Sequence, residues 1–263
     1  MIKRQERNCF DVIKSEFEHP AVIFWRAIEA RYLEDTINKY NPQEPILDLG
    51  CAEGKIASAL FKDKHLFGLD NCWDLIKENK QTDTYKSLVL ADGCKMPFKN
   101  NSFGCIFSNC VIEHIPELNS LLNEAQRVLK LKGLFIFTVP SERFGEFLFF
   151  HRLFKALRLT LFANWYSKKR NEKLNHFHCY GNAAWKEKLK EKNLFMLEHI
   201  YYMPKKAVML WDWLAISVFL VNKIKPLGFI KRYITRRLKS SLDKFYSQNL
   251  DSGGALLIVA AKN

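Results

Sequence analysis

The sequence predicts an α/β fold with a doubly wound, mostly parallel sheet of seven strands. Three observations predict it: short apolar runs alternate with helical spacing up to Pro140, several of these runs end at a glycine or an aspartate, and two further apolar runs follow near the end of the chain. The 263 residues, 48% of them hydrophobic, are enough for one domain with its own core. We therefore expect a single domain over 1–263.

The first half of the chain contains the parallel part of the expected sheet. Helical spacing covers Ala21–Tyr40 and stops at Asn41-Pro42. The expected strands are Ile46–Leu49, His65–Leu69, Ser87–Ala91, Phe103–Ser108 and Leu134–Val139. Between them we expect helices at 55–62, from near Asp74, and at Leu118–Leu129. This alternation favours right-handed βαβ crossovers and parallel strands.

After Pro140 the alternation breaks. The segment Phe144–Ala163 predicts one apolar helix with Arg152, Lys155 and Arg158 on one side. A helix at 183–192 and strands at 195–202 and 255–260 follow, with an apolar segment at 207–221. The last two strands are expected to pair at one edge of the sheet. Two helical lid insertions are therefore expected, at about 141–182 after the fifth strand and at about 203–252 between the sixth and seventh.

Polar residues and glycines gather where the predicted strands end. The segment Asp48–Gly54 joins a buried strand to a helix, and its glycines allow a tight turn beside the free N–H groups of the helix. Asp70 and Asp92 end the next two strands, and Asn109 with Cys110 ends the fourth. A carboxylate at the second strand end can accept hydrogen bonds from ribose hydroxyls, and one at the third can accept from an adenine amino group.

The segments Ile46–Gly54, Phe67–Asp70, Leu90–Phe98 and Phe103–Val139 resemble class I S-adenosylmethionine-dependent methyltransferases. The resemblance is to the broad group that includes ubiquinone and menaquinone C-methyltransferases and many small-molecule methyltransferases. It implies a Rossmann-like fold with its cofactor half at about 21–140, S-adenosyl-L-methionine as cofactor and S-adenosyl-L-homocysteine as product. The matching positions place Asp48, Gly50, Cys51 and Gly54 around the methionine part, Asp70 on the ribose, Asp92 and Gly93 beside adenine, and Asn109 and Cys110 toward the sulfonium.

One position departs from this pattern. Ala52 stands where the resembled motif often has a glycine. An alanine keeps that backbone at a negative φ. We therefore expect a changed loop that still binds the cofactor.

A general base is needed only if the methyl acceptor still holds its proton. The candidates are His114, His176, His178 and Tyr180, and His176 and His178 would point the same way on an extended segment. Glu113 is interpreted as a structural acceptor, and Cys51 and Cys110 as small packing residues. The seven cysteines form no C-x-x-C pair, so no metal site is predicted.

The formal charge of +13 predicts attraction to an anionic partner. Basic residues between Arg143 and Lys244 are interleaved with large apolar ones, which suits either a lid over the acceptor or a membrane interface. Segment 207–221 contains Asp212 and is shorter than a span requires. The first twenty residues lack an apolar run typical of a secretory signal. We expect a cytoplasmic protein, peripheral on the inner membrane face. The basic residues expected to contribute to binding at the membrane surface are Lys223, Lys225, Lys231, Arg232, Arg236, Arg237 and Lys239.

The expected function is methyl transfer to a small, lipophilic or lipid-linked acceptor. Alternative acceptors are a soluble metabolite, a sugar or RNA, although no added module for nucleic-acid recognition is visible. A non-catalytic membrane adaptor with the same fold also remains open. A nicotinamide-dependent oxidoreductase is disfavoured because Asp92 would have no role in it. The acceptor, the methylated atom and the oligomeric state are not fixed by the sequence.

Overall fold

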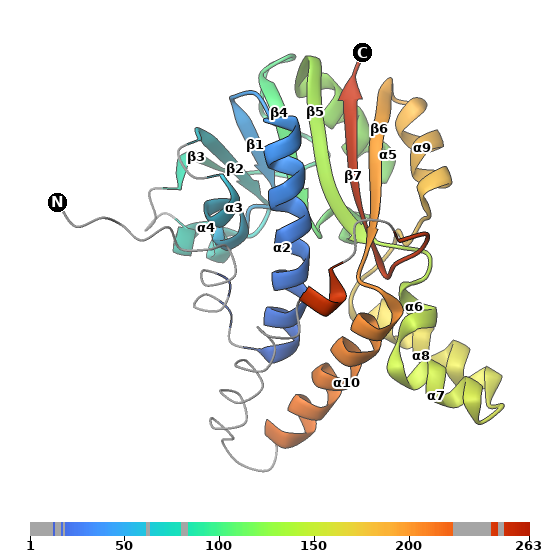
Figure 1. Cartoon of the computed structure of the whole chain (residues 1–263). Helices are drawn as coiled ribbons and strands as arrows, with labels where there is room; N and C mark the ends of the chain where they lie inside the picture. The colour runs from blue at the N-terminus through green and yellow to red at the C-terminus, as the bar shows by residue number, and fades with distance from the viewer. Residues whose placement is uncertain are drawn as a thin grey trace.

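The computed structural model describes residues 13, 17, 19–61, 64–79, 84–222, 243–246 and 250–263. Its sheet has seven strands in the order β3-β2-β1-β4-β5-β7-β6, and β7 runs antiparallel to both of its neighbours (Figure 1). The strands are β1 (Ile46–Leu49), β2 (Leu66–Asp70), β3 (Tyr85–Leu90), β4 (Phe103–Asn109), β5 (Leu129–Pro140), β6 (Leu194–Tyr202) and β7 (Ala255–Lys262). The predicted fold class and the edge pairing of the last two strands are confirmed.

Helices cover both faces of the sheet, so its central strands β1 and β4 are buried on both sides. They are α2 (Pro20–Tyr40), α3 (Lys55–Leu60), α4 (Trp73–Asn79), α5 (Leu118–Val128) and α9 (Asn182–Lys190), with short 3₁₀ turns η1 (Ile112–His114) and η2 (Asp243–Phe245). Successive β1 residues face opposite ways: Ile46 packs with Phe24 of α2, and Leu47 packs with Leu121 of α5. The sheet is thus the middle layer of three.

The lid contains α6 (Phe144–Phe147), α7 (Phe149–Ala156), α8 (Thr160–Lys173) and α10 (Lys205–Asn222). The prediction of one helix over Phe144–Ala163 is wrong. The backbone leaves the helical region at Leu148, where ψ is 142°, and turns at Arg158, where φ is +60°. As a result α7 and α8 form an antiparallel hairpin that projects away from the sheet beside α10 (Figure 1).

A buried carboxylate anchors this hairpin to α10. Asp212 of α10 is fully buried and accepts hydrogen bonds from the Tyr166 hydroxyl at 2.8 and 2.9 Å. Arg170 of α8 lies 3.2 Å from the same carboxylate, and its guanidinium stands over the Trp211 ring. Asp212, which interrupts the apolar sequence of α10, therefore links α10 to α8.

Among the residues described, no helix is long and apolar enough to cross a bilayer. The basic residues Lys223, Lys225, Lys231, Arg232, Arg236, Arg237 and Lys239 lie outside the described residues.

Candidate functional site

The loop after β1 holds two glycines in the left-handed region. Gly50 has φ of +77° and Gly54, at the N-cap of α3, has φ of +73°. A Cβ on Gly50 would come within 2.4 Å of Val111 Cγ2, so no side chain fits there. Ala52 also has a positive φ, +42°, so it does not meet the condition of a negative φ under which an alanine would keep the motif's backbone. Its N–H donates to Asp70 Oδ2 at 2.9 Å, and this bond supports the strained backbone.

A cavity of about 430 Å³ opens at the ends of the parallel strands, and we call it the strand-end cavity. Gly50, Asp70, Asp92, Gly93 and His114 are among its lining residues. Asp70 Oδ1 accepts from the N–H of Cys72 and Asp92 Oδ1 from that of Cys94, at 2.9 and 2.8 Å. These local bonds fix both carboxylates at the rim, where they can accept from a ligand.

A smaller cavity of about 100 Å³, the glycine-loop cavity, adjoins the first and shares Gly50 and Ala52 with it. Asp48, Cys51 and Asn109 also line it, whereas Gly54 does not. Burial raises the pKa of Asp48 to about 7, and nearby Asp70 adds to this, against a hydrogen bond from the Tyr85 hydroxyl. Asp48 is therefore poised to lose a proton when a cation arrives beside it.

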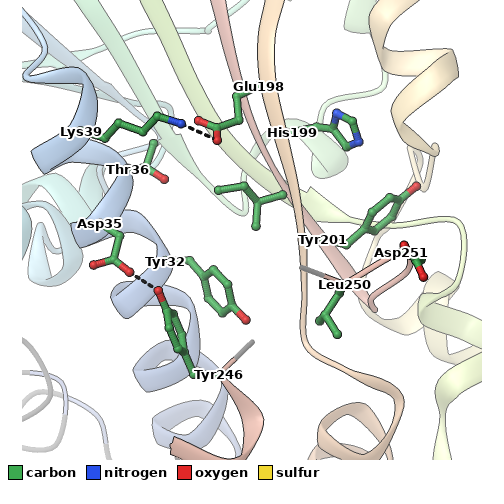
Figure 2. A pocket seen from close by; sticks show the side chains of 11 residues that line it. Tyr32, Asp35, Thr36, Lys39, Glu198, His199, Tyr201, Tyr246, Leu250 and Asp251 are labelled. Atoms are coloured by element: carbon green, nitrogen blue, oxygen red, sulfur yellow. Dashed lines mark hydrogen bonds and ion pairs between the residues drawn. The ribbon is translucent and has the colours of Figure 1, made fainter. Parts of the chain in front are cut away.

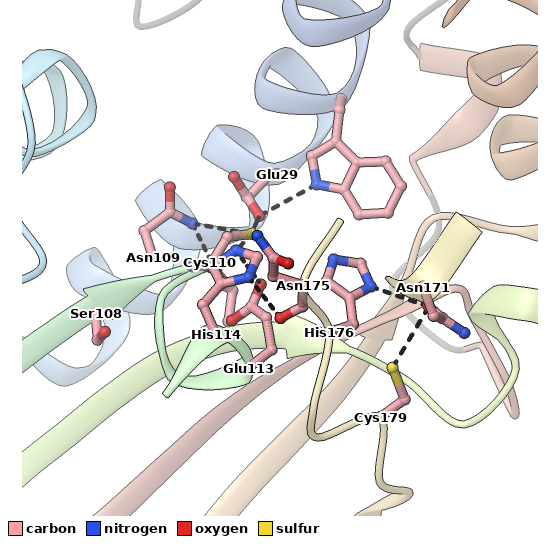
Figure 3. A network of polar contacts seen from close by, with 12 residues as sticks. Glu29, Ser108, Asn109, Cys110, Glu113, His114, Asn171, Asn175, His176 and Cys179 are labelled. Atoms are coloured by element: carbon pink, nitrogen blue, oxygen red, sulfur yellow. Dashed lines mark hydrogen bonds and ion pairs between the residues drawn. The ribbon is translucent and has the colours of Figure 1, made fainter. Parts of the chain in front are cut away.

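The helix α2 contributes two charged residues that the sequence analysis missed. Arg26 Nη1 donates to Glu29 Oε2 at 2.5 Å and to Asn109 Oδ1 at 2.8 Å. Glu29 is buried and also accepts from the Tyr202 hydroxyl at 2.6 Å. It accepts from the Cys110 thiol as well (Figure 3). Burial alone would raise the pKa of Glu29, but the charge of Arg26 and the hydrogen bond from Tyr202 hold it below its usual range.

A third cavity, of about 190 Å³, lies under the lid, and we call it the apolar cavity. It shares Arg26 with the glycine-loop cavity and His114 with the strand-end cavity. Its other lining residues are largely apolar: Val22, Trp25, Pro140, Phe144, Leu174 and Trp211, with Cys110, Glu113 and His176 between them. The three cavities thus adjoin one another from the strand ends to the lid.

The four candidate bases fall in different places. His114 and His176 both line the apolar cavity, and their ring centroids are 5.5 Å apart (Figure 3). Burial, helped by His114, lowers the pKa of His176 to about 4, so this ring is neutral at pH 7. His178 instead hydrogen-bonds the Ile115 carbonyl oxygen at 2.8 Å, and its ring stacks on Tyr180. Neither His178 nor Tyr180 lines any of the three cavities.

Cys110 also lines the apolar cavity, and its thiol is kept neutral. Burial raises the pKa of the Cys110 thiol well above its ordinary value, and Glu29 adds to this effect. Its N–H donates to the Thr138 carbonyl oxygen at 3.1 Å, with φ of +53°. This environment suits a packing residue, as predicted, and disfavours a nucleophile.

A fourth cavity, of about 530 Å³, lies between α2 and the edge strand β6 (Figure 2). Three of its charged residues have partners within the lining: Lys39 pairs with Glu198 at 2.7 Å, and Asp35 accepts from the Tyr246 hydroxyl. It shares no lining residue with the three cavities above. No site residue predicted from the sequence lines it.

Residues 47–137 match the model of a protein family described as a methyltransferase domain. The chain is 31% identical over 99 residues to a malonyl-[acyl-carrier protein] O-methyltransferase of Legionella pneumophila, covering 35% of each protein. It is 34% identical over 92 residues to the human mitochondrial arginine-hydroxylase NDUFAF5, covering 34% of this chain and 27% of the relative. The chain thus matches about a third of the length of these curated relatives.

Solved structures share the fold across almost the whole chain. A protein of Galdieria sulphuraria, provisionally named a sarcosine dimethylglycine methyltransferase, has a TM-score of 0.64 at 15% identity and is covered over 98% of both chains. Geranyl diphosphate C-methyltransferase from Streptomyces coelicolor has a TM-score of 0.57 at 14% identity, with 90% of this chain and 77% of that chain covered. At these identities the likeness shows the fold alone.

Proposed function

We propose that this chain, which carries a class I methyltransferase domain, transfers a methyl group from S-adenosyl-L-methionine to a small lipophilic or lipid-linked acceptor. The observation that carries the proposal is the run of three adjoining cavities, polar at the strand ends and apolar under the lid. A nucleoside with a charged amino-acid tail suits the polar end. An apolar molecule suits the space between Trp25, Phe144 and Trp211.

The residues of the polar cavities fit the cofactor. Asp70 is at the position to accept from ribose hydroxyls, and Asp92 with Gly93 to hold the adenine. Asp48 would carry the negative charge opposite the amino group, and Arg26 lines the same cavity with a positive charge suited to the carboxylate. Asn109 lies where this cavity approaches the acceptor space, and Cys110 lies on the acceptor side.

Methyl transfer places modest demands on the protein. When bound, S-adenosyl-L-methionine supplies a methyl group already activated by a positive sulfur. The chain then has to align an acceptor atom in line with that methyl group and keep water out. The aromatic side chains of the apolar cavity serve the second purpose. If the acceptor atom holds a proton, His114 and His176 are the two predicted bases in reach of that cavity.

The hairpin of α7 and α8 supports a lipid-facing location. Its tip exposes Leu157, Leu161, Phe162 and Trp165, with Leu161 83% exposed. Exposed basic residues on the two helices and the turn between them include Arg152, Lys155, Arg158, Lys168 and Lys169. Large apolar side chains flanked by Lys and Arg favour the interface of an anionic membrane. We include peripheral membrane binding on the cytoplasmic face in the proposed function.

Cofactor binding is tested by calorimetric titration with S-adenosyl-L-homocysteine. We expect saturable binding by the wild type. In Asp70→Ala we expect the binding free energy to weaken by about 1–3 kcal/mol, because the ribose hydroxyls lose their acceptor. Asp251→Ala, in the fourth cavity, is the matched control. No binding by the wild type, or equal affinity in Asp70→Ala, would contradict the cofactor assignment.

Membrane binding is tested separately by sedimentation with phosphatidylglycerol and phosphatidylcholine vesicles. The wild type should sediment with the anionic vesicles, and the double variant Leu161→Ser, Phe162→Ser should stay in solution. Leu197→Ser, at an exposed position of β6, is the control for loss of apolar surface elsewhere. Wild type that does not sediment, or sediments no better than the double variant, rules out this role of the hairpin.

A further inference from the structure

We propose that Glu113, His114 and His176 bind a divalent transition-metal ion in the apolar cavity. One carboxylate oxygen and one nitrogen from each ring lie within 4.8 Å of one another. Glu113 Oε1 and His114 Nε2 are 3.9 Å apart. Two atoms bound to a tetrahedral zinc ion are about 3.4 Å apart, so Glu113 and His114 have to approach each other by about 0.5 Å, and the widest pair by at most about 1.4 Å.

The two histidine rings are already oriented as metal ligands. His114 Nδ1 is 3.1 Å from the Asn175 carbonyl oxygen, and His176 Nδ1 is 3.1 Å from Asn171 Oδ1 (Figure 3). Because these oxygens only accept, each neutral ring carries its proton on Nδ1 and a lone pair on Nε2. Proteins commonly hold metal-binding histidines by such a hydrogen bond from the other ring nitrogen.

The buried side chain of Glu113 is a second, independent reason to expect a cation in this place. Its side chain is 2% exposed, and Oε2 has no hydrogen-bond partner among the described residues. A buried polar atom left without a partner is costly. Arg26, a cation lining the same cavity, donates to Glu29 and Asn109. A cation between Glu113 and the two rings would satisfy this carboxylate.

The ligand set indicates the kind of ion and its use. Two imidazoles and one carboxylate suit Zn²⁺ or Fe²⁺ and leave a coordination position open toward the cavity. This use rests on the proposed function and makes His114 and His176 metal ligands in place of bases: the open position would hold an acceptor hydroxyl and help its proton leave to solvent. The oxygen then forms a bond to the methyl carbon as the carbon–sulfur bond breaks, and the bonding pair stays on sulfur.

The site was not visible in the sequence. Glu113 and His114 follow β4, whereas His176 follows α8, and only the lid brings them together. Spacing rules for metal motifs look for ligands within one short segment. The test therefore has to measure binding by the folded, full-length chain.

The experiment titrates the full-length chain with Co²⁺ and monitors binding by visible absorption. Zn²⁺ is then added to displace the bound Co²⁺. We expect one saturable site, which is lost in His114→Ala and in His176→Ala. In Asn171→Ala we expect binding about 10–100-fold weaker, because His176 Nδ1 loses the side-chain oxygen that orients its ring. His199→Ala, an exposed histidine of β6, is the matched control and should bind as wild type.

Binding of S-adenosyl-L-homocysteine is measured on the same samples, so that misfolding of a variant is recognised. Absence of saturable Co²⁺ or Zn²⁺ binding by the wild type would overturn the metal site. The same holds if both histidine variants bind as tightly as the wild type. Metal binding without cofactor binding would instead contradict only the proposed methyl transfer and leave the site standing.

Discussion

Two buried carboxyl groups near the polar cavities, Asp48 and Glu29, differ in charge state because their surroundings differ. Asp70 and Asp92 accept from backbone N–H groups at the rim. Asp48 is buried beside the Asp70 charge, and its pKa is raised to about 7. Glu29 is equally buried but stays ionised through Arg26. The carboxylate nearest the proposed amino group of the cofactor is thus the one that gains most from a cation.

Asp48→Asn is expected to change how stability depends on pH. Because the raised pKa means that folded Asp48 stays protonated while the unfolded residue ionises, wild-type stability falls between about pH 4 and pH 7. The asparagine variant does not lose stability in this way. The free energy of unfolding of the variant relative to the wild type should therefore rise over that range by at most about 4 kcal/mol and then level off. Urea unfolding at several pH values measures it. A difference that does not change with pH would contradict the assignment.

Gly50→Ala is expected to lower both stability and cofactor affinity. An alanine at φ of +77° costs about 1–2 kcal/mol, and its Cβ would also collide with Val111. We expect S-adenosyl-L-homocysteine affinity to fall at least about tenfold, equivalent to about 1.4 kcal/mol. Gly145→Ala, where a Cβ would be 3.2 Å from Ser167 Cβ, is the control. Unchanged affinity in Gly50→Ala would show that the loop does not touch the cofactor.

At this scale the sequence predicted the strand-end residues better than the residues that reach the site from elsewhere. Asp70, Asp92 and Gly93 line the expected cavity because their positions follow from strand ends. Arg26 and Glu29 belong to a helix whose place over β4 depends on tertiary packing. A signal did exist: both charges occur in the first half of the helix, among apolar residues such as Phe24 and Ile28 that are buried.

The elements of the lid depend on polar contacts as well as on apolar packing. Asp212 fixes α10 to α8 through Tyr166 and Arg170. The break between α7 and α8 at Arg158 has no glycine or proline to signal it, so helical spacing alone predicted one continuous helix. The boundaries of β1 and of α5 were predicted closely because a strand followed by glycine and a strongly amphipathic helix are clear local patterns.

Asp212→Ala is expected to loosen the lid, because it leaves Arg170 and Tyr166 without their buried partner. Removing one member of a buried pair costs about 3 kcal/mol, which corresponds to a fall in Tm of roughly 6–12 °C at this size. Calorimetry measures the change. Glu146→Ala removes an exposed partner of Arg143 and should leave Tm near that of the wild type. If both variants melt alike, Asp212 is not the anchor.

At the scale of the whole molecule, the parallel strands direct their carboxyl ends toward the lid. The three adjoining cavities lie there, bounded by the loop after β1, by α2 and by the lid. Polar surface for a nucleotide-like cofactor and apolar surface for an acceptor therefore meet near Arg26 and His114. The net charge of +13 and the exposed tip of the hairpin are the two features that support the proposed location at an anionic membrane surface.

The most direct test of methyl transfer by this site uses S-adenosyl-L-methionine with a labelled methyl group and a whole-cell extract of the source organism. After reaction, the extract is separated into organic and aqueous fractions, with Asp92→Ala as the control. We predict label in the organic fraction that depends on the wild-type chain and is lost in the variant. Label in neither fraction, despite cofactor binding by the wild type, would contradict methyl transfer and favour an adaptor that only retains the fold.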